Sequence, residues 1–178
     1  WERFGSWLQG TTFARLIMHK FSDAIRERFG DDVDLRVDSD CRLVRDFTNY
    51  SISPHTDAPR KLVSLLFYLP GNESMRHLGT SIYRPCDPSF RCEGVVHHPF
   101  EKFLKVATMD YRPNSLLAFF KNDVAFHGVD TISDAEIERD VLLYNLYCRK
   151  VVSTHSSVSA EPRSVRPAAA WPWQTVGT

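Results

Sequence analysis

The chain has 178 residues, 43% of them hydrophobic and 25% charged, so we expect one water-soluble globular domain with little room for a second. Lys plus Arg equals Asp plus Glu, and this zero net charge argues against nucleic acid or a membrane surface as a partner, because both usually select a basic face. No stretch approaches the roughly 18 consecutive apolar residues of a membrane span, and no signal peptide stands out.

The first thirty residues carry the hydrophobic pattern of a helix. Apolar side chains recur at three- and four-residue steps, which places them on one helical face: Phe13, Leu16, Ile17, Phe21, Ile25 and Phe29. Gly30 follows as a natural helix end. We therefore expect one helix over residues 10–30 that packs against a sheet. The acidic run from Asp31 to Asp40 is interpreted as a solvated connection.

After this run the pattern changes to short strands rich in Val, Leu, Phe and Tyr, separated by Pro, Gly and Asn turns. The expected strands are Cys41–Thr48, Leu62–Leu69, Thr80–Arg84, Phe103–Tyr111, Ser115–Lys121 and Arg139–Arg149. One helix followed by many strands favours a mainly β fold with a flanking N-terminal helix and a jelly-roll core over residues 35–150. We expect residues 1–150 to form a single domain and residues 151–178, rich in Ser, Ala and Pro, to form an irregular tail.

The segment from residue 85 to 99 lacks periodicity and is expected to be a long loop, of the kind that often forms a lid. It carries two Cys and two His, but their Cys-x5-Cys-x4-His-His spacing differs from the closer ligand pairs of structural zinc sites. We therefore prefer a lid to a zinc knuckle. Four cysteines in the whole chain do not suggest a disulfide scaffold, which favours reduced thiols and a cytoplasmic location.

The segment PHTD contains His55 and Asp57, two residues apart. In an extended chain such residues point to the same side, so an imidazole and a carboxylate can bind one metal ion. An accidental His-x-Asp is about an even-odds event in such a composition, so the pair alone indicates little. Downstream, an apolar strand and a turn bring His127 close to the start of another strand, and Arg139 begins the apolar run RDVLLYNLY. A cation at the head of a strand is ordinarily exposed to solvent.

Four segments resemble, in this order, the 2-oxoglutarate/Fe(II) dioxygenases, particularly their prolyl-hydroxylase-like branch: NYSISPHTDAPRKLVSLLFYLP, GTSIYRP, PNSLLAFFKNDVAFHGV and RDVLLYNLY. In that family a His-x-Asp pair is followed by a strand ending in Tyr-Leu and by a Gly-led strand. A strand that leads to a second His comes next, and then a basic residue. The resemblance covers roughly residues 50–147 and implies a distorted double-stranded β-helix, a relative of the jelly roll.

By this resemblance, His55, Asp57 and His127 are the catalytic metal ligands of Fe(II), with 2-oxoglutarate as co-substrate and O2 as oxidant. Two imidazoles and one carboxylate suit Fe(II) and leave positions open for both. Related halogenases replace the carboxylate by a small residue, so Asp57 favours an oxygenase that hydroxylates or desaturates an aliphatic carbon. The expected substrate is a small metabolite or a peptidyl residue.

The resemblance also implies a binding site for 2-oxoglutarate. Arg139 matches the family's basic residue, and a guanidinium can bind the distal carboxylate through two parallel hydrogen bonds. Tyr68 stands where relatives place a tyrosine hydroxyl on the same carboxylate, with a core tyrosine as the simpler alternative. Strand alternation places Ser64 and Leu66 on the same face as Tyr68, so both are expected to line the pocket.

Substrate contacts are less defined. The candidates near the expected pocket are Tyr50, Arg45, Arg91, His97 and His98. Arg60, Lys61 and Arg84 lie near its expected edges, where solvation is the simpler interpretation. An alternative function is a jelly-roll metal-containing binding protein without oxygenase activity, because a fold does not determine a function. A Ser-His-Asp hydrolase is not supported, since the chain has no GxSxG motif.

Overall fold

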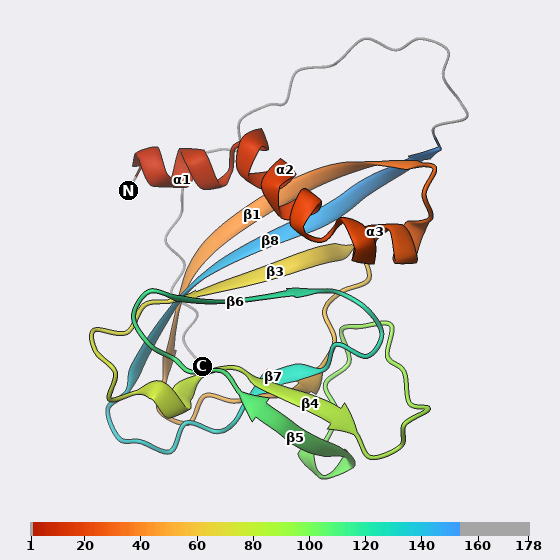
Figure 1. Cartoon of the computed structure of the whole chain (residues 1–178). Helices are drawn as coiled ribbons and strands as arrows, with labels where there is room; N and C mark the ends of the chain where they lie inside the picture. Colours follow the sequence, from red (N-terminus) through yellow and green to blue (C-terminus); the bar gives the residue numbers. More distant parts are fainter. Residues whose placement is uncertain (1, 154–178) are drawn as a thin grey trace.

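The computed structural model describes residues 2–153, in which three helices precede eight strands (Figure 1). The helices are α1 (Glu2–Leu8), α2 (Thr11–Lys20) and α3 (Ser22–Phe29). The strands are β1 (Val33–Phe47), β2 (Ile52–His55), β3 (Lys61–Tyr68), β4 (Ser81–Pro85), β5 (Phe103–Thr108), β6 (Ser115–Phe120), β7 (His127–Val129) and β8 (Glu138–Ser153). Within this range no helix is both long enough and apolar enough to cross a membrane. The first three residues of the predicted irregular tail, 151–153, belong to β8, and the rest of the tail lies outside the described residues.

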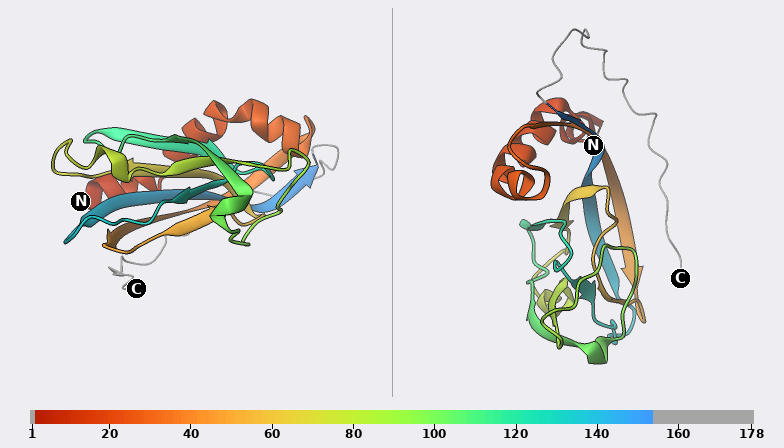
Figure 2. Two further views of the ribbon diagram at one scale, coloured as in Figure 1. Left: turned by 90° about the horizontal axis from the view of Figure 1, so that it is seen from below. Right: turned by 90° about the vertical axis from the view of Figure 1, so that its right-hand side faces the viewer.

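The strands form two four-stranded antiparallel sheets, ordered β1-β8-β3-β6 and β2-β7-β4-β5. Their pairing is nested: β1 pairs with β8, β2 with β7, β3 with β6 and β4 with β5. This nested pairing across two sheets is the strand arrangement of a jelly roll, or double-stranded β-helix. Figures 1 and 2 show the helices toward one end of the first sheet and the second sheet toward its other end. The predicted mainly β, jelly-roll fold class is confirmed.

Alternation along β3 and β8 divides the first sheet between two interiors, because successive side chains point to opposite faces. Val63 of β3 and Tyr144 of β8 pack with Phe13 of α2 in the core beneath the helices. Ser64 and Leu66 face the other way and line a cavity between the two sheets. The helices therefore stabilise one face of the sheet and leave the other face for a site.

Two predictions for the N-terminal part are wrong. The helix expected over residues 10–30 is two helices, α2 and α3, that meet at Phe21, and α1 precedes them. The acidic run is the first half of β1 and pairs with the end of β8. Its alternation explains the strand: Val33, Leu35 and Val37 pack in the helix-side core while the charged residues between them face away.

Candidate metal and co-substrate site

Two strands of the second sheet bring the predicted metal ligands together. His55 ends β2, His127 begins β7, and the two are direct partners in the β2–β7 ladder. Gly128 permits this approach, because a Cβ there would lie 2.4 Å from the carbonyl oxygen of Ile52. Asp57 follows β2 on the same side as His55. One ligand atom from each of these three side chains lies within 4.8 Å of the others, so they can hold a metal ion.

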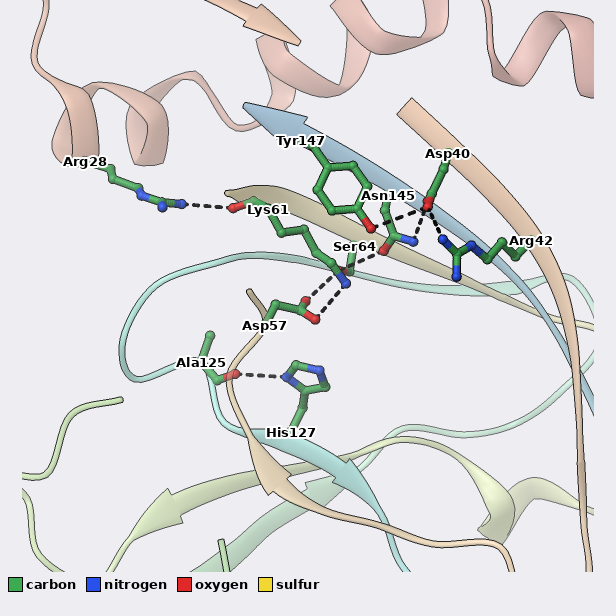
Figure 3. Close-up of polar contacts among 10 residues, drawn as sticks. All are labelled: Arg28, Asp40, Arg42, Asp57, Lys61, Ser64, Ala125, His127, Asn145 and Tyr147. Carbon is green, nitrogen blue, oxygen red and sulfur yellow. Dashed lines mark hydrogen bonds and ion pairs between the residues drawn. The ribbon is translucent and has the colours of Figure 1, made fainter. Parts of the chain in front are cut away.

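The two imidazoles are oriented by backbone carbonyls. Nδ1 of His55 is 3.0 Å from the carbonyl oxygen of Ser53. Nδ1 of His127 is 3.0 Å from the carbonyl oxygen of Ala125, a contact that Figure 3 draws. A proton on each Nδ1 leaves Nε2 as the lone-pair donor, which is how metal-binding histidines are commonly fixed. Burial lowers the pKa of His55 to about 4, with His127 adding to the effect, and burial also lowers the pKa of His127. Both rings are therefore neutral at pH 7, as a metal ligand requires.

Both carboxylate oxygens of Asp57 have partners. The Lys61 ammonium lies 2.7 Å from Oδ1, and the Ser64 hydroxyl donates to Oδ2 at 2.7 Å (Figure 3). Burial alone would raise the pKa of Asp57, but Lys61, His127 and Ser64 outweigh it and the pKa is lowered. Asp57 is thus held as an anion in a fixed orientation.

A polar chain extends from Asp57 across the first sheet (Figure 3). The Ser64 hydroxyl oxygen lies 3.4 Å from Oδ1 of Asn145, whose amide nitrogen donates to Asp40 at 2.8 Å. Asp40 also pairs with Arg42 at 3.0 Å. Because these residues lie on β1, β3 and β8, the first sheet fixes the orientation of a carboxylate that belongs to the loop after β2.

A cavity of about 280 Å³ lies between the sheets and connects the three ligands with Arg139. Along β8 its lining residues are Tyr147, Asn145, Leu143, Val141 and Arg139, so Tyr147 and Asn145 lie toward the metal ligands and Arg139 at the far end. Other apolar wall residues are Val44, Ile52, Leu66, Phe119 and Val129. The cavity therefore has a polar group at each end and an apolar middle.

An isolated cation at the start of a strand would be solvated, but Arg139 is buried. Its side chain is 3% exposed and pairs with Asp46 at 2.5 Å. Its Nε donates to the carbonyl oxygen of Leu78 at 2.6 Å, and the guanidinium lies 5.8 and 5.3 Å from the ring centroids of Tyr68 and Tyr111. The surrounding rings and carbonyl hold the guanidinium at one place in the cavity wall.

Of the four residues predicted to bind the co-substrate, three line the cavity and one does not. Arg139, Ser64 and Leu66 line the cavity. Tyr68 is absent from the lining, and its hydroxyl accepts a hydrogen bond from the amide of Thr80 at 3.1 Å. The direct contact between Tyr68 and the co-substrate is therefore not supported: the tyrosine buttresses Arg139 and the start of β4. Ser64 holds Asp57 as well as lining the cavity.

Of the predicted substrate contacts, Tyr50 lines the cavity and His97 stacks on His55, with ring centroids 4.5 Å apart. Arg45 does not reach the cavity, since strand alternation turns it to the outer face, where it pairs with Glu138 and Asp140. Arg91 is exposed and donates to carbonyl oxygens of its own loop. His98 packs against Phe90, Phe103 and Phe126 and does not line the cavity.

The loop from residue 85 to 99 packs against the metal-ligand segment rather than standing free. The amide of Val95 donates to the carbonyl of Thr56, and that of His98 donates to the carbonyl of Pro54. Cys92 and Phe90 join an apolar cluster, so this part of the expected lid is packed on the domain. Cys86 is exposed and Cys92 buried, and within residues 2–153 the group of candidate metal ligands is His55, Asp57 and His127.

The packing of this loop against Asp57 depends on Gly94 and can be tested there. Its φ is +134°, and a Cβ there would lie 2.2 Å from the carbonyl oxygen of Asp57. We expect Gly94→Ala to displace Asp57 and to weaken Mn(II) binding by about tenfold or more, comparable to the loss of an outer contact to a metal ligand. Gly71→Ala is the matched control, because no atom lies within 4 Å of a Cβ there. Equal Mn(II) affinities in calorimetric titration of the two variants would contradict this role of Gly94.

The residues that sequence reasoning missed are polar partners of the predicted ones. They include Asp46, which pairs with Arg139, Asn145, which contacts Ser64, and Asp40, which accepts from Asn145. Gly94, which packs against Asp57, was missed as well. The strand alternation of Arg42, Val44 and Asp46 on β1 was a usable signal for Asp46, once the register with β8 was known. Lys61 was noted as a pocket-edge cation, but its ion pair with Asp57 was not predicted.

No family model matches the chain, and no curated protein matches it. Among solved structures, a Pseudomonas putida prolyl-4-hydroxylase is similar to 76% of this chain, with 20% sequence identity and a TM-score of 0.41. The match covers 64% of the hydroxylase, so this chain corresponds to less than two thirds of its length. The structure of this chain brings together the His55, Asp57 and His127 set that the sequence resemblance predicted.

Proposed function

We propose that this protein is a non-haem Fe(II) oxygenase that couples oxidative decarboxylation of 2-oxoglutarate to hydroxylation, or desaturation, of an aliphatic carbon. The observation that carries this proposal is one cavity with His55, Asp57 and His127 at one end and Arg139 at the other. Such a cavity suits a co-substrate with a chelating 2-oxo acid at one end and a carboxylate at the other. Its apolar middle suits the two methylene groups between them.

The donor set fits iron(II). Two imidazole nitrogens and one carboxylate oxygen are the ligands of the facial triad, which leaves positions open for small ligands. When bound, iron(II) would supply the oxidation chemistry: one oxygen atom of O2 would enter succinate as 2-oxoglutarate loses carbon dioxide, and the second would be inserted into the substrate C–H bond in hydroxylation or released as water in desaturation.

The protein's own part is placement and exclusion of water. Lys61 and Ser64 hold Asp57 in one orientation, and the ring of Phe119 packs against His127 with centroids 4.4 Å apart. Arg139 would bind and orient the distal carboxylate of 2-oxoglutarate, as a charged donor fixed in the wall. A co-substrate held at both ends cannot rotate within the cavity.

The substrate is proposed to be a small metabolite or a peptidyl residue that enters beside the metal ligands. Arg42, Asn145 and Tyr147 line the cavity at the metal-ligand end, and His97 is exposed beside His55. These groups can form hydrogen bonds to a polar substrate, whereas the cavity beyond them is taken by the proposed co-substrate.

Release of succinate tests the proposal. Purified protein with Fe(II), O2 and 2-oxoglutarate should form succinate slowly alone and faster when a panel of amino acids, other metabolites and peptides contains a substrate. Omission of Fe(II) or of O2 should stop the reaction. A protein that binds both metal and 2-oxoglutarate but forms no succinate across the panel would favour the alternative, a metal-containing binding protein.

A further inference from the structure

The Arg139 end of the cavity holds a carboxylate that the proposed function does not use. Asp46 lies on β1 opposite Arg139 of β8, and both side chains line the cavity. The Asp46 side chain is 7% exposed and accepts a hydrogen bond of 2.5 Å from Nη1 of Arg139. The cation expected to bind the co-substrate therefore already has an anion beside it.

A second carboxylate at this place changes the charge balance. With the distal carboxylate of 2-oxoglutarate bound, one guanidinium would neutralise two buried anions and leave one negative charge without a counter-ion. An unpaired charge in an apolar site is costly, and buried acids usually avoid the cost by taking up a proton. Two carboxylates that share one site commonly have one strongly raised pKa for this reason.

The surroundings offer no second cation to this site among the described residues that line it near Asp46. Tyr50 and Thr80 line the cavity there and are neutral, and the nearby Tyr111 is neutral as well. The charge of Asp140 helps to raise the pKa of Asp46, but the Asp140 carboxylate pairs with Arg45 on the outer face. Each of these neighbours is uncharged or already paired, so none compensates an added anion.

The protonation behaviour of the free site agrees with this geometry. Burial raises the pKa of Asp46, and this effect outweighs the lowering by Arg139. Burial, helped by the charge of Asp46, raises the pKa of Tyr50 to about 12, so this hydroxyl keeps its proton and can act as a donor. The site is therefore already unfavourable to negative charge before any ligand enters.

We propose that Asp46 is a positioning residue that holds Arg139 in the free protein and takes up one proton when the distal carboxylate of 2-oxoglutarate binds. This inference rests on the proposed function. The proton comes from solvent, neutralises the Asp46 carboxyl group and returns to solvent when the dicarboxylate leaves. The protonated carboxyl group can still accept from Arg139 through its carbonyl oxygen and can donate its O–H to the bound carboxylate.

Calorimetric titration of the Mn(II)-loaded protein with 2-oxoglutarate tests the coupling. Titrations at one pH in buffers of different ionisation enthalpy give the number of protons taken up. Between about pH 6.5 and 8.5 we expect uptake to approach one proton, and the apparent Kd to rise by up to about tenfold per pH unit. Binding without proton uptake over this range would overturn the proposal, because Asp46 would then keep one charge state throughout.

Asp46→Asn provides the matched variant, since an amide has the shape and the donor of a protonated carboxyl group. We expect its 2-oxoglutarate affinity to vary less than about twofold over the same range, with no proton uptake. Asp140→Asn, at the neighbouring carboxylate paired with Arg45, should keep the uptake. Uptake retained in Asp46→Asn would overturn the assignment to Asp46.

An infrared difference spectrum gives a readout that does not depend on affinity. Addition of 2-oxoglutarate should produce the carbonyl stretch of a protonated carboxyl group in the wild-type protein and not in Asp46→Asn. A failure of the proposed function is distinguishable: the Mn(II)-loaded protein would then not bind 2-oxoglutarate at any pH. Binding in the absence of this infrared band would overturn the Asp46 proposal alone.

Discussion

Asp57→Ala is expected to abolish succinate formation and to weaken divalent metal binding by at least about a hundredfold. Asp57 is the only carboxylate of the three-ligand group within residues 2–153, so its loss removes the anionic donor and leaves two neutral imidazoles. Loss of an outer-sphere partner alone typically lowers metal affinity about 10–100-fold, and a ligand should matter more. Mn(II) titration followed by a succinate assay measures both effects.

The variant also leaves Lys61 without its 2.7 Å partner, so folding must be checked separately. Asp110→Ala is a suitable control, because it removes a half-exposed carboxylate that pairs with Arg76 outside the cavity. The control should keep metal affinity and activity. Full metal affinity in a folded Asp57→Ala protein would contradict the assignment of Asp57 as a ligand.

Arg139→Leu is expected to weaken 2-oxoglutarate binding by at least tenfold while leaving Mn(II) affinity nearly unchanged. Each charge-assisted hydrogen bond that is lost should cost about 1.5–3 kcal/mol, and about 1.4 kcal/mol already corresponds to a factor of ten. Arg139 lies at the other end of the cavity from the metal ligands, so the two affinities should separate. Calorimetric titration with metal and then with co-substrate makes the comparison.

The same substitution leaves Asp46 buried without its cation, which typically destabilises a protein by about 3–5 kcal/mol. The double variant Arg139→Leu, Asp46→Asn removes that unpaired charge. It should recover much of the free energy of unfolding in urea titration and still bind 2-oxoglutarate weakly. Restored 2-oxoglutarate affinity in the double variant would show that Arg139 acts on stability and not on the co-substrate.

Most strands could be predicted because their signals are local. The metal ligands could be predicted because the order of four segments resembles a known family, and the structure brings His55, Asp57 and His127 together. The nested strand order agrees with the jelly roll expected from one helical segment followed by short apolar strands. The prediction of a solvated connection for the first half of β1 is wrong because it rested on the acidic residues and not on their alternation with Val33, Leu35 and Val37.

The partners of the functional residues could not be predicted, because they depend on register between distant strands. Asp46 meets Arg139 only through the β1–β8 pairing, across a sequence separation of 93 residues. Asn145 reaches Ser64 through the β3–β8 register in the same way. The outward turn of Arg45 also depends on a strand face that could not be assigned before the register was known. Tyr68 shares the predicted face of Ser64 and Leu66, but the contact of its hydroxyl with the Thr80 amide is again long-range.

The most direct test of the central claim is a crystal structure of the protein soaked without oxygen in Fe(II) and 2-oxoglutarate. We predict one iron ion about 2.0–2.2 Å from His55, Asp57 and His127, a range typical of nitrogen and oxygen ligands to divalent metals. The 2-oxo acid end of the co-substrate should lie on the metal and its distal carboxylate should contact Arg139. Iron at another site, or 2-oxoglutarate absent from the cavity at saturating concentration, would contradict the proposed oxygenase.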